Sequence, residues 1–270
     1  MSTLLNGRYH TVYDGACSLP AVKISEDHPR YRSLVTRERM AAMVERGIVS
    51  TTGLIAHGRG EAFDYLLGEA TTPEAEAAEA AAAALLSLAR RPVITVNGNA
   101  AALAARELGD LARACGAPLE VNLFHRSDRR MDLVCDFVEG ETGLKVLGRD
   151  QDAVLEGIAS DRARCTREGL LSADVVLIPL EDGDRAQAMV KAGKRVISID
   201  LNPLSRTSLA AEVAVVDEIT RAVPGITAWC SRFRTRPEEA RGVLAAFDNH
   251  ENLGSLLQRI CRGLEEGPPK

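Results

Sequence analysis

The sequence predicts an α/β protein whose core is a Rossmann-like, doubly wound and mostly parallel sheet, with helices before and after it. Three observations support this prediction. From residue 91 onward, short runs rich in β-branched residues alternate with amphipathic stretches. Each run ends at a turn that contains polar residues or glycine, and two helical patterns precede the first run. Strands that alternate with helices form parallel sheets covered on both faces.

The expected elements follow in order along the chain. Two helices come first, over 29–46 and 73–89, because Pro29 suits a first turn, Gly47 suits a helix end and Thr72 suits an N-cap. The expected strands are 92–96, 119–124, 144–147, 174–178, 195–200 and 213–216. The helices between and after them are expected over 100–115, 128–138, 185–192, 219–233, 237–247 and 252–265. Residues 1–23 are expected to be an N-terminal extension and 24–270 a single domain.

The composition narrows the class of protein. A chain of 270 residues with 46% hydrophobic content can bury a large core. It lacks the ~20-residue apolar run of a membrane helix and the apolar segment of a signal peptide, so we expect a cytoplasmic protein that does not bind membranes. The net charge of −5 argues against a nucleic-acid partner.

Cysteine and histidine give no sign of a zinc site. The six cysteines form no C-x-x-C pair and the five histidines form no H-E-x-x-H motif. A metal ion in this protein would therefore be held by oxygen ligands.

A glycine-rich stretch over 53–61 is the first candidate site. Glycines around a turn that opens a short helix let backbone N–H groups approach an anion, and His57 and Arg59 add directed donors. The stretch does not match the phosphate-binding motif G-x-x-x-x-G-K-[ST], and a simple tight turn is the alternative.

Polar residues also follow the expected strands. Asn97 and Asn99 flank a glycine after the first strand, and His125 and Arg126 follow the second. The carboxyl ends of parallel strands are where open α/β sheets bind ligands. Turn chemistry alone would explain the asparagines equally well.

Acidic residues are concentrated after the fourth and fifth expected strands. Asp182 and Asp184 can hold Mg²⁺ or accept an ammonium group. Asp200 is placed like the acid that binds ribose hydroxyls, with Arg206 one turn further on to reach a phosphate. Because these groups share one sheet edge, we expect a phosphorylated, nucleotide-like ligand there.

Several motifs together resemble the archaeal phosphopantothenate synthetase family, also called 4-phosphopantoate–β-alanine ligase. They are HPRY at 28–31, GLIAHGRGEAFDYLLGE at 53–69, PVITVNGN at 92–99, EVNLFHR at 120–126, PLEDGDR at 179–185 and DLNPLSR at 200–206. The resemblance runs from Ile24 to the C-terminal helices, while the residues before Ile24 are extra.

The resemblance implies a homodimeric ligase with a Rossmann-like core. It implies that 4-phosphopantoate, β-alanine and ATP give 4′-phosphopantothenate, AMP and diphosphate through an acyl-adenylate, a step of coenzyme A biosynthesis. The ATP contacts that it implies are Arg37, Arg59, Asp200, Leu201, Asn202, Arg206, Thr207, Glu218 and Ile219.

We add hypotheses for the remaining side chains. Arg59 would clamp the polyphosphate, and His57 and Asn99 would orient the pantoate carboxylate or the leaving diphosphate. Asp182 and Asp184 would hold Mg²⁺ or the β-alanine ammonium. Arg30, His125 and Arg126 would hold the 4-phosphate of the substrate, and Asn97 and Arg185 would be further substrate contacts.

Two other functions stay open from the sequence. A Rossmann oxidoreductase or methyltransferase is disfavoured because the fingerprint G-x-G-x-x-G is missing. A nucleotide-sensing module without chemistry would bind ATP and form no AMP.

Overall fold

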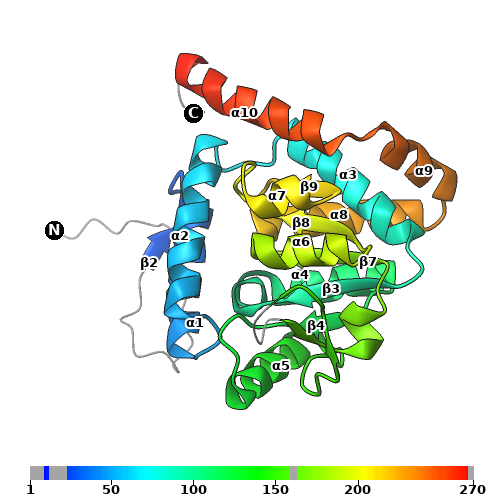
Figure 1. Ribbon diagram of the computed structural model, residues 1–270. Helices are drawn as coiled ribbons and strands as arrows, with labels where there is room; N and C mark the ends of the chain where they lie inside the picture. The colour runs from blue at the N-terminus through cyan, green and yellow to red at the C-terminus, as the bar shows by residue number, and fades with distance from the viewer. Residues whose placement is uncertain (1–8, 12–22, 159–162, 267–270) are drawn as a thin grey trace.

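The computed structural model, shown in Figure 1, describes residues 9–11, 23–158 and 163–266. Its centre is a sheet of five strands in which every neighbouring pair is parallel. The order across the sheet is β4 (Leu119–Val121), β3 (Pro92–Val96), β7 (Val175–Pro179), β8 (Arg195–Ile199) and β9 (Val213–Val215). This confirms the predicted doubly wound α/β class.

The strands form where the β-branched runs are because both faces of the sheet are buried. In β7, Val175 and Leu177 belong to one hydrophobic core, and Val176 and Ile178 to the other. Side chains of a strand point alternately to opposite faces, so a strand between two cores must be apolar throughout. A run without hydrophobic–polar alternation is therefore what the sequence shows.

Helices cover both faces of the sheet. The larger core lies under α3 (Pro73–Leu88), α4 (Gly98–Cys115) and α8 (Ile219–Phe233), with α5 (Asp128–Thr142) against α4 and α9 (Pro237–Ala246) against α3. The smaller core lies under α6 (Gly183–Lys191) and α10 (Asn249–Glu266), and α7 (Arg206–Ala210) packs on α6. Two of the C-terminal helices, α8 and α10, thus cover opposite faces of the sheet.

Two helices stand beside the sheet instead of over a face, α1 (Tyr31–Glu45) and α2 (Thr51–Leu66) (Figure 1). The prediction of a glycine-rich turn after Gly53 is wrong, because α2 runs without a break through that stretch. The Ser50 hydroxyl caps the helix by accepting the Gly53 N–H, which starts the helix before the glycines. A Cβ on Gly53 would lie 2.5 Å from Asn99 Oδ1, so this glycine permits close packing on α4.

Other differences concern short strands. The expected strand over 144–147 is not one, since only Leu147 forms a bridge, with Glu120. Two small antiparallel pairs were not expected, β1 (Tyr9–Thr11) with β2 (Lys23–Ser25), and β5 (Ala153–Val154) with β6 (Arg164–Cys165). After β6 comes a short π-helix, η2 (Arg167–Leu171). Of the expected N-terminal extension only 9–11 and Lys23 lie among the described residues, so the division into extension and domain stays a prediction.

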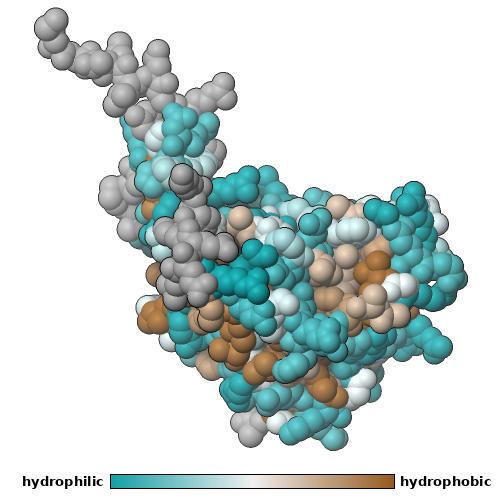
Figure 2. Space-filling view, turned by 90° about the horizontal axis from the view of Figure 1, so that it is seen from above, coloured by the Kyte–Doolittle hydropathy of each residue, from teal (hydrophilic) through white to brown (hydrophobic). Residues whose placement is uncertain are grey.

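The strand order defines where a ligand crevice should form. The chain leaves β3 for β4 on one side, then crosses to β7 on the other side of β3. In doubly wound sheets, such a switch point opens a crevice at the carboxyl ends of the strands. Among the described helices, none combines the length and the hydrophobicity needed to cross a membrane. Figure 2 shows a largely hydrophilic surface with small hydrophobic areas on the face seen from above.

Candidate functional site

A cavity of about 860 Å³ lies at this crevice, between α2 and the carboxyl ends of β3, β4, β7 and β8. It contains most of the residues that the sequence analysis assigns to a site. Those assigned to ATP that line it are Arg59, Asp200, Leu201, Asn202, Arg206 and Thr207. The others that line it are His57, Asn97, Asn99, Asp182, His125 and Arg185.

Asparagines after β3 hold the crevice together. Asn97 caps α4 through its Oδ1, which accepts the Ala100 N–H, and its Nδ2 donates to the carbonyls of Pro179 and Leu180 at 3.0 and 2.9 Å. Asn99 Nδ2 donates to the Gly53 carbonyl at 2.8 Å. The two amides therefore tie the end of β3 to the end of β7 and to α2.

The segment after β8 is a closed loop of hydrogen bonds. The Asp200 carboxylate accepts the Ser205 hydroxyl at 2.5 Å and the Asn202 N–H at 3.1 Å. Burial raises the pKa of Asp200, and these hydrogen bonds act in the opposite direction. Ser205 in turn caps α7, and Thr207 Oγ1 donates to the Glu181 carbonyl at 2.8 Å. This loop presents rigid oxygen and N–H groups, which suits a ribose and its phosphates.

The acidic residues after β7 are paired with arginines. Glu181 accepts Arg185 Nη1 at 2.8 Å, while Arg206 contacts Asp184 at 2.5 Å and Asp182 at 3.7 Å. Within the described ranges, no group of three or more His, Cys, Asp or Glu side chains could hold a metal ion. Asp182 and Asp184 remain as candidate oxygen ligands for a metal ion, and each lies next to the guanidinium of Arg206.

Two side chains of α2 line the cavity, and they differ in burial and charge. His57 is 9% exposed, its Nε2 has no hydrogen-bond partner, and burial is the main cause that lowers its pKa. It is therefore a neutral imidazole at neutral pH. Arg59 is exposed and forms no ion pair with an acidic residue of the described chain.

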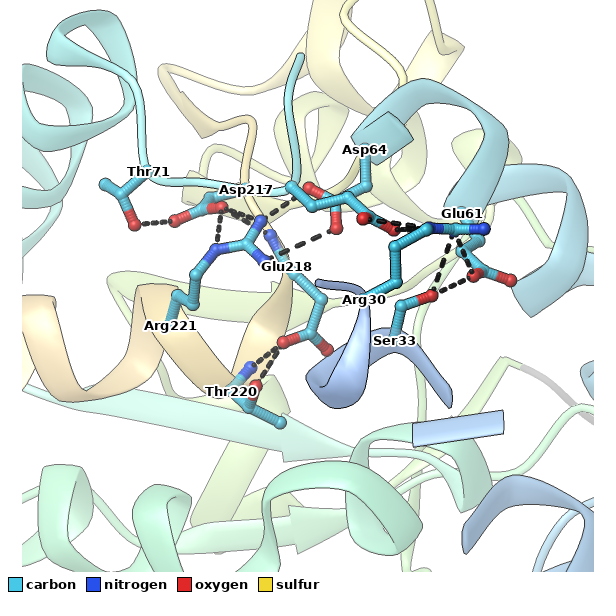
Figure 3. A network of polar contacts seen from close by, with 10 residues as sticks. Arg30, Ser33, Glu61, Asp64, Thr71, Asp217, Glu218, Thr220 and Arg221 are labelled. Atoms are coloured by element: carbon cyan, nitrogen blue, oxygen red, sulfur yellow. Dashed lines mark hydrogen bonds and ion pairs between the residues drawn. The ribbon is translucent and has the colours of Figure 1, made fainter. Parts of the chain in front are cut away.

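Six assigned residues lie outside the cavity lining: Arg30, Arg37, Arg126, Asp184, Glu218 and Ile219. Arg30 is bound to Glu69 at 2.6 Å, and Arg37 is bound to Glu61. Figure 3 shows Arg30, Ser33 and Glu61 as one cluster between α1 and α2. These contacts use the guanidinium groups to hold the two helices together.

The other four of these residues either contact polar neighbours or lie in the core. Arg126 is 3.5 Å from Asp128, and Asp184 is bound to Arg206. Glu218 caps α8 through Thr220, and Ile219 is 1% exposed in the core. The end of β9 lies beside the segment after β8, because the Asp200 N–H donates to the Val215 carbonyl at 3.1 Å.

Asn122 and Arg130 are two of the polar cavity residues that the sequence analysis does not assign. Asn122 accepts Arg185 Nη2 and donates to the buried Glu120 at 3.1 Å. Arg130 donates to the carbonyls of Ile48 at 2.9 Å and His125 at 2.8 Å. The Ile48 contact joins residues 82 positions apart, so no local pattern could reveal it.

A second buried polar cluster joins α2 to α8. Arg221 is bound to both Asp64 and Asp217, and Asp217 also accepts the Thr71 hydroxyl at 2.6 Å (Figure 3). Close by, Glu79 is 4% exposed, and its Oε1 has no hydrogen-bond partner. Burial, then repulsion from Asp217, raises the pKa of Glu79 to about 8.

Glu79 makes the stability of the protein depend on pH. Its pKa is higher in the folded chain than in the unfolded chain, so its stabilising contribution is complete below about pH 4.5 and is lost as the pH rises to about 8. In the wild type, this loss of unfolding free energy is at most about 1.4 kcal/mol per pH unit. We expect the Glu79→Gln variant not to show it. Urea unfolding of both proteins at several pH values measures it. A difference between them that does not grow with pH would contradict the assignment.

Comparisons with known proteins identify the family of this chain. The family model described as phosphopantothenate/pantothenate synthetase matches residues 74–263. Three relatives are each named 4-phosphopantoate–β-alanine ligase. The relative from Methanosarcina mazei is 48% identical over 243 residues, which is 90% of this chain and 96% of the relative. The relative from Methanospirillum hungatei JF-1 is 55% identical over 208 residues, 77% of this chain and 85% of the relative.

The third relative, from Thermococcus onnurineus, is 44% identical over 242 residues, 88% of this chain and 92% of the relative. The family model spans residues 74–263, which include the five strands of the central sheet. The comparisons confirm the resemblance that the motifs at 53–69, 92–99 and 200–206 indicate. The chain belongs to the phosphopantothenate/pantothenate synthetase family.

Proposed function

We propose that this chain is an ATP-dependent ligase that joins 4-phosphopantoate to β-alanine and yields 4′-phosphopantothenate, AMP and diphosphate. One observation supports this most. A single cavity connects the loop after β8, residues 200–205, with the amide, imidazole and guanidinium groups after β3, β4 and β7. A volume of about 860 Å³ suits a nucleotide with a second small substrate beside it.

The proposed reaction has two steps. A carboxylate oxygen of 4-phosphopantoate attacks the α-phosphorus of ATP, and diphosphate leaves. The amine of β-alanine then attacks the acyl carbon of the adenylate, loses a proton and displaces AMP, which keeps the carboxylate oxygen. Negative charge develops on the α-phosphate during the first step. Guanidinium groups that line the cavity, such as those of Arg59 and Arg206, would stabilise such charge.

We assign ATP to the half of the cavity next to β8. Asp200 and Asn202 face the ribose, with Leu201 beside them, and Arg206 and Thr207 face the phosphates. Glu218 and Ile219 follow β9, the neighbouring strand, and border the base. Arg37 reaches a phosphate only by leaving Glu61, so Arg37→Ala should weaken ATP binding less than Arg59→Ala.

We assign the pantoate moiety to the other half. His57 carries an unpaired Nε2 that can meet the carboxylate, and Asn99, Asn97 and His125 shape this side of the cavity. Arg185 is a substrate donor there. Arg30 and Arg126, also assigned to the substrate from the sequence, do not line the cavity and are paired with Glu69 and Asp128.

Mg²⁺ would bind at the acidic segment together with ATP, where Asp182 lines the cavity. Proteins commonly bind Mg²⁺ through one or two carboxylates together with substrate phosphates. Asp182 and Asp184 would supply those carboxylates, and Arg206 would be released to a phosphate. When bound, the ion would neutralise phosphate charge.

We also propose that the protein is a homodimer that pairs through α2. The outer side of this helix exposes Ile55 by 69%, Tyr65 by 54% and Leu66 by 49%. Exposed apolar groups gathered on one helix indicate a contact surface. Light scattering should give twice the chain mass of 29.0 kDa for the wild type. Ile55→Arg combined with Leu66→Glu should give the monomer mass, and a dimer that persists in this variant would contradict the α2 interface.

The activity is tested by measuring AMP in reactions from which each substrate is omitted in turn. With ATP, 4-phosphopantoate and β-alanine together, we expect AMP, diphosphate and the amide in equal amounts. With 4-phosphopantoate omitted, no AMP should form. Formation of ADP, or binding of ATP without AMP in the complete mixture, would overturn the proposal.

A further inference from the structure

Two arginines that line the cavity, Arg59 and Arg130, have no acidic partner within the described ranges, and they lie next to different parts of α2. Arg59 is on α2 itself, and Arg130 contacts the carbonyl of Ile48 just before α2 begins. Residues 53 and 59 are separated by about 9 Å along a helix axis. The other two cavity arginines, Arg185 and Arg206, are neutralised by Glu181 and by Asp182 and Asp184.

Arg130 is held in place without losing its charge. Its guanidinium donates to the carbonyls of Gly47, Ile48 and His125, and it forms no ion pair with the acidic residues that the structure describes. Burial is the cause that lowers its pKa, yet a guanidinium stays protonated at neutral pH. The result is a fixed, partly buried positive charge in the cavity wall.

Helices α2 and α4 begin next to each other. Arg130 Nη2 would be 2.9 Å from a Cβ on Gly98, the first residue of α4, so the guanidinium lies against that helix start. Ser50, Thr52 and Gly53 at the start of α2 line the same cavity. Both helices are long, and their N-terminal N–H groups favour an anion.

A fully buried donor in the same wall also indicates an anionic ligand. Arg185 is 3% exposed and lines the cavity, and its Nε is one of the buried nitrogens without a hydrogen-bond partner in the described chain. Asn122 fixes the orientation of Arg185 by accepting its Nη2, and Glu120 fixes Asn122. A rigid donor left unpaired in a binding cavity is satisfied when a ligand supplies an acceptor.

From these observations we infer that Arg130, with the starts of α2 and α4 and the Nε of Arg185, forms the subsite for the 4-phosphate of the pantoate substrate. Arg130 is thereby the residue that selects the phosphorylated acid over the unphosphorylated one. This inference rests on the proposed function and deepens it. The sequence-based hypothesis gives this phosphate to Arg30, His125 and Arg126. Of these only His125 lines the cavity, whereas Arg30 and Arg126 are paired with Glu69 and Asp128 outside it.

Selectivity is measured as a ratio of two constants, the Ki for pantoate as a competitive inhibitor and the KM for the phosphorylated acid. Removing one partner of a charge-assisted contact weakens binding by about 30-fold or more. We therefore expect Arg130→Gln to lower this ratio by about that factor, mainly by raising the KM for the phosphorylated acid, while the KM for ATP stays within about twofold. Arg129→Gln is the matched control, because Arg129 is exposed on the same helix and does not line the cavity.

Arg130→Lys separates charge from support of the loop. Lysine keeps the charge but lacks the planar fork, so it should retain part of the selectivity that Arg130→Gln loses. It also provides the measurement if Arg130→Gln does not fold. If Arg130 only supports the carbonyls, its variants will weaken pantoate and 4-phosphopantoate by the same factor, and that result overturns the inference. If the wild type forms no AMP from 4-phosphopantoate, the proposed function itself fails instead.

Discussion

Arg59→Ala should lower the rate of AMP formation by about 100-fold or more. Arg59 is exposed in the cavity, close enough to Asp200 to affect its pKa, and is not neutralised by an ion pair in the described chain. Its charge is therefore available to the phosphates of ATP. Removal of one preorganised donor to transition-state charge has an effect of this size, and it should appear in kcat as well as in the KM for ATP.

The matched control for Arg59 is Arg32→Ala. Arg32 is also an exposed arginine, but it lies on α1 and does not line the cavity. It should keep the wild-type rate within about twofold. Diphosphate release followed in stopped-flow experiments separates the adenylation step from amide formation. If Arg59→Ala releases diphosphate at the wild-type rate, Arg59 does not act on the α-phosphate.

Arg221→Met should lower the free energy of unfolding by about 3–5 kcal/mol. The change leaves Asp64 and Asp217 buried without their cation, and both carboxylates are nearly inaccessible to water. Burial already raises the pKa of Asp64, which Arg221 counteracts. Because Arg221 also joins α8 to α2, the loss should loosen the helix that lines the cavity.

Urea unfolding of Arg221→Met and of Arg241→Met provides the comparison. Arg241 forms an exposed ion pair with Glu238, which is worth about 0.5 kcal/mol at most. The additional change Asp217→Asn should restore part of the stability of Arg221→Met, since it removes one of the unpaired charges. A loss below about 1 kcal/mol in Arg221→Met would show that the buried cluster is not a main source of stability.

Local patterns predicted the fold because the strands are buried on both faces. Runs such as 92–96 and 195–200 needed only their β-branched residues, and Thr72 marked a helix start that the structure confirms. One exception was α2, where Gly53 suggested a turn. The cap at Ser50 and the close packing against Asn99 determine the helix there, and the second of these is a tertiary contact.

The site was predictable to the extent that its residues follow strands. Asn97, Arg185 and Asp200 come directly after strands, so the parallel sheet brings them together. Arg130 and Arg221 could not be predicted in this way. The Ile48 carbonyl that Arg130 holds is 82 residues away, and Asp64 is 157 residues from Arg221. Only the folded chain shows that Arg130 has no acidic partner among the described residues, whereas Arg221 has two, Asp64 and Asp217.

The central claim is that the cavity brings the carboxylate of 4-phosphopantoate to the α-phosphorus of ATP. The most direct test uses 4-phosphopantoate labelled with ¹⁸O in its carboxylate, followed by mass spectrometry of the products. We predict one labelled oxygen in each AMP molecule and no label in diphosphate. Label in inorganic phosphate together with ADP, or AMP without label, would contradict the claim.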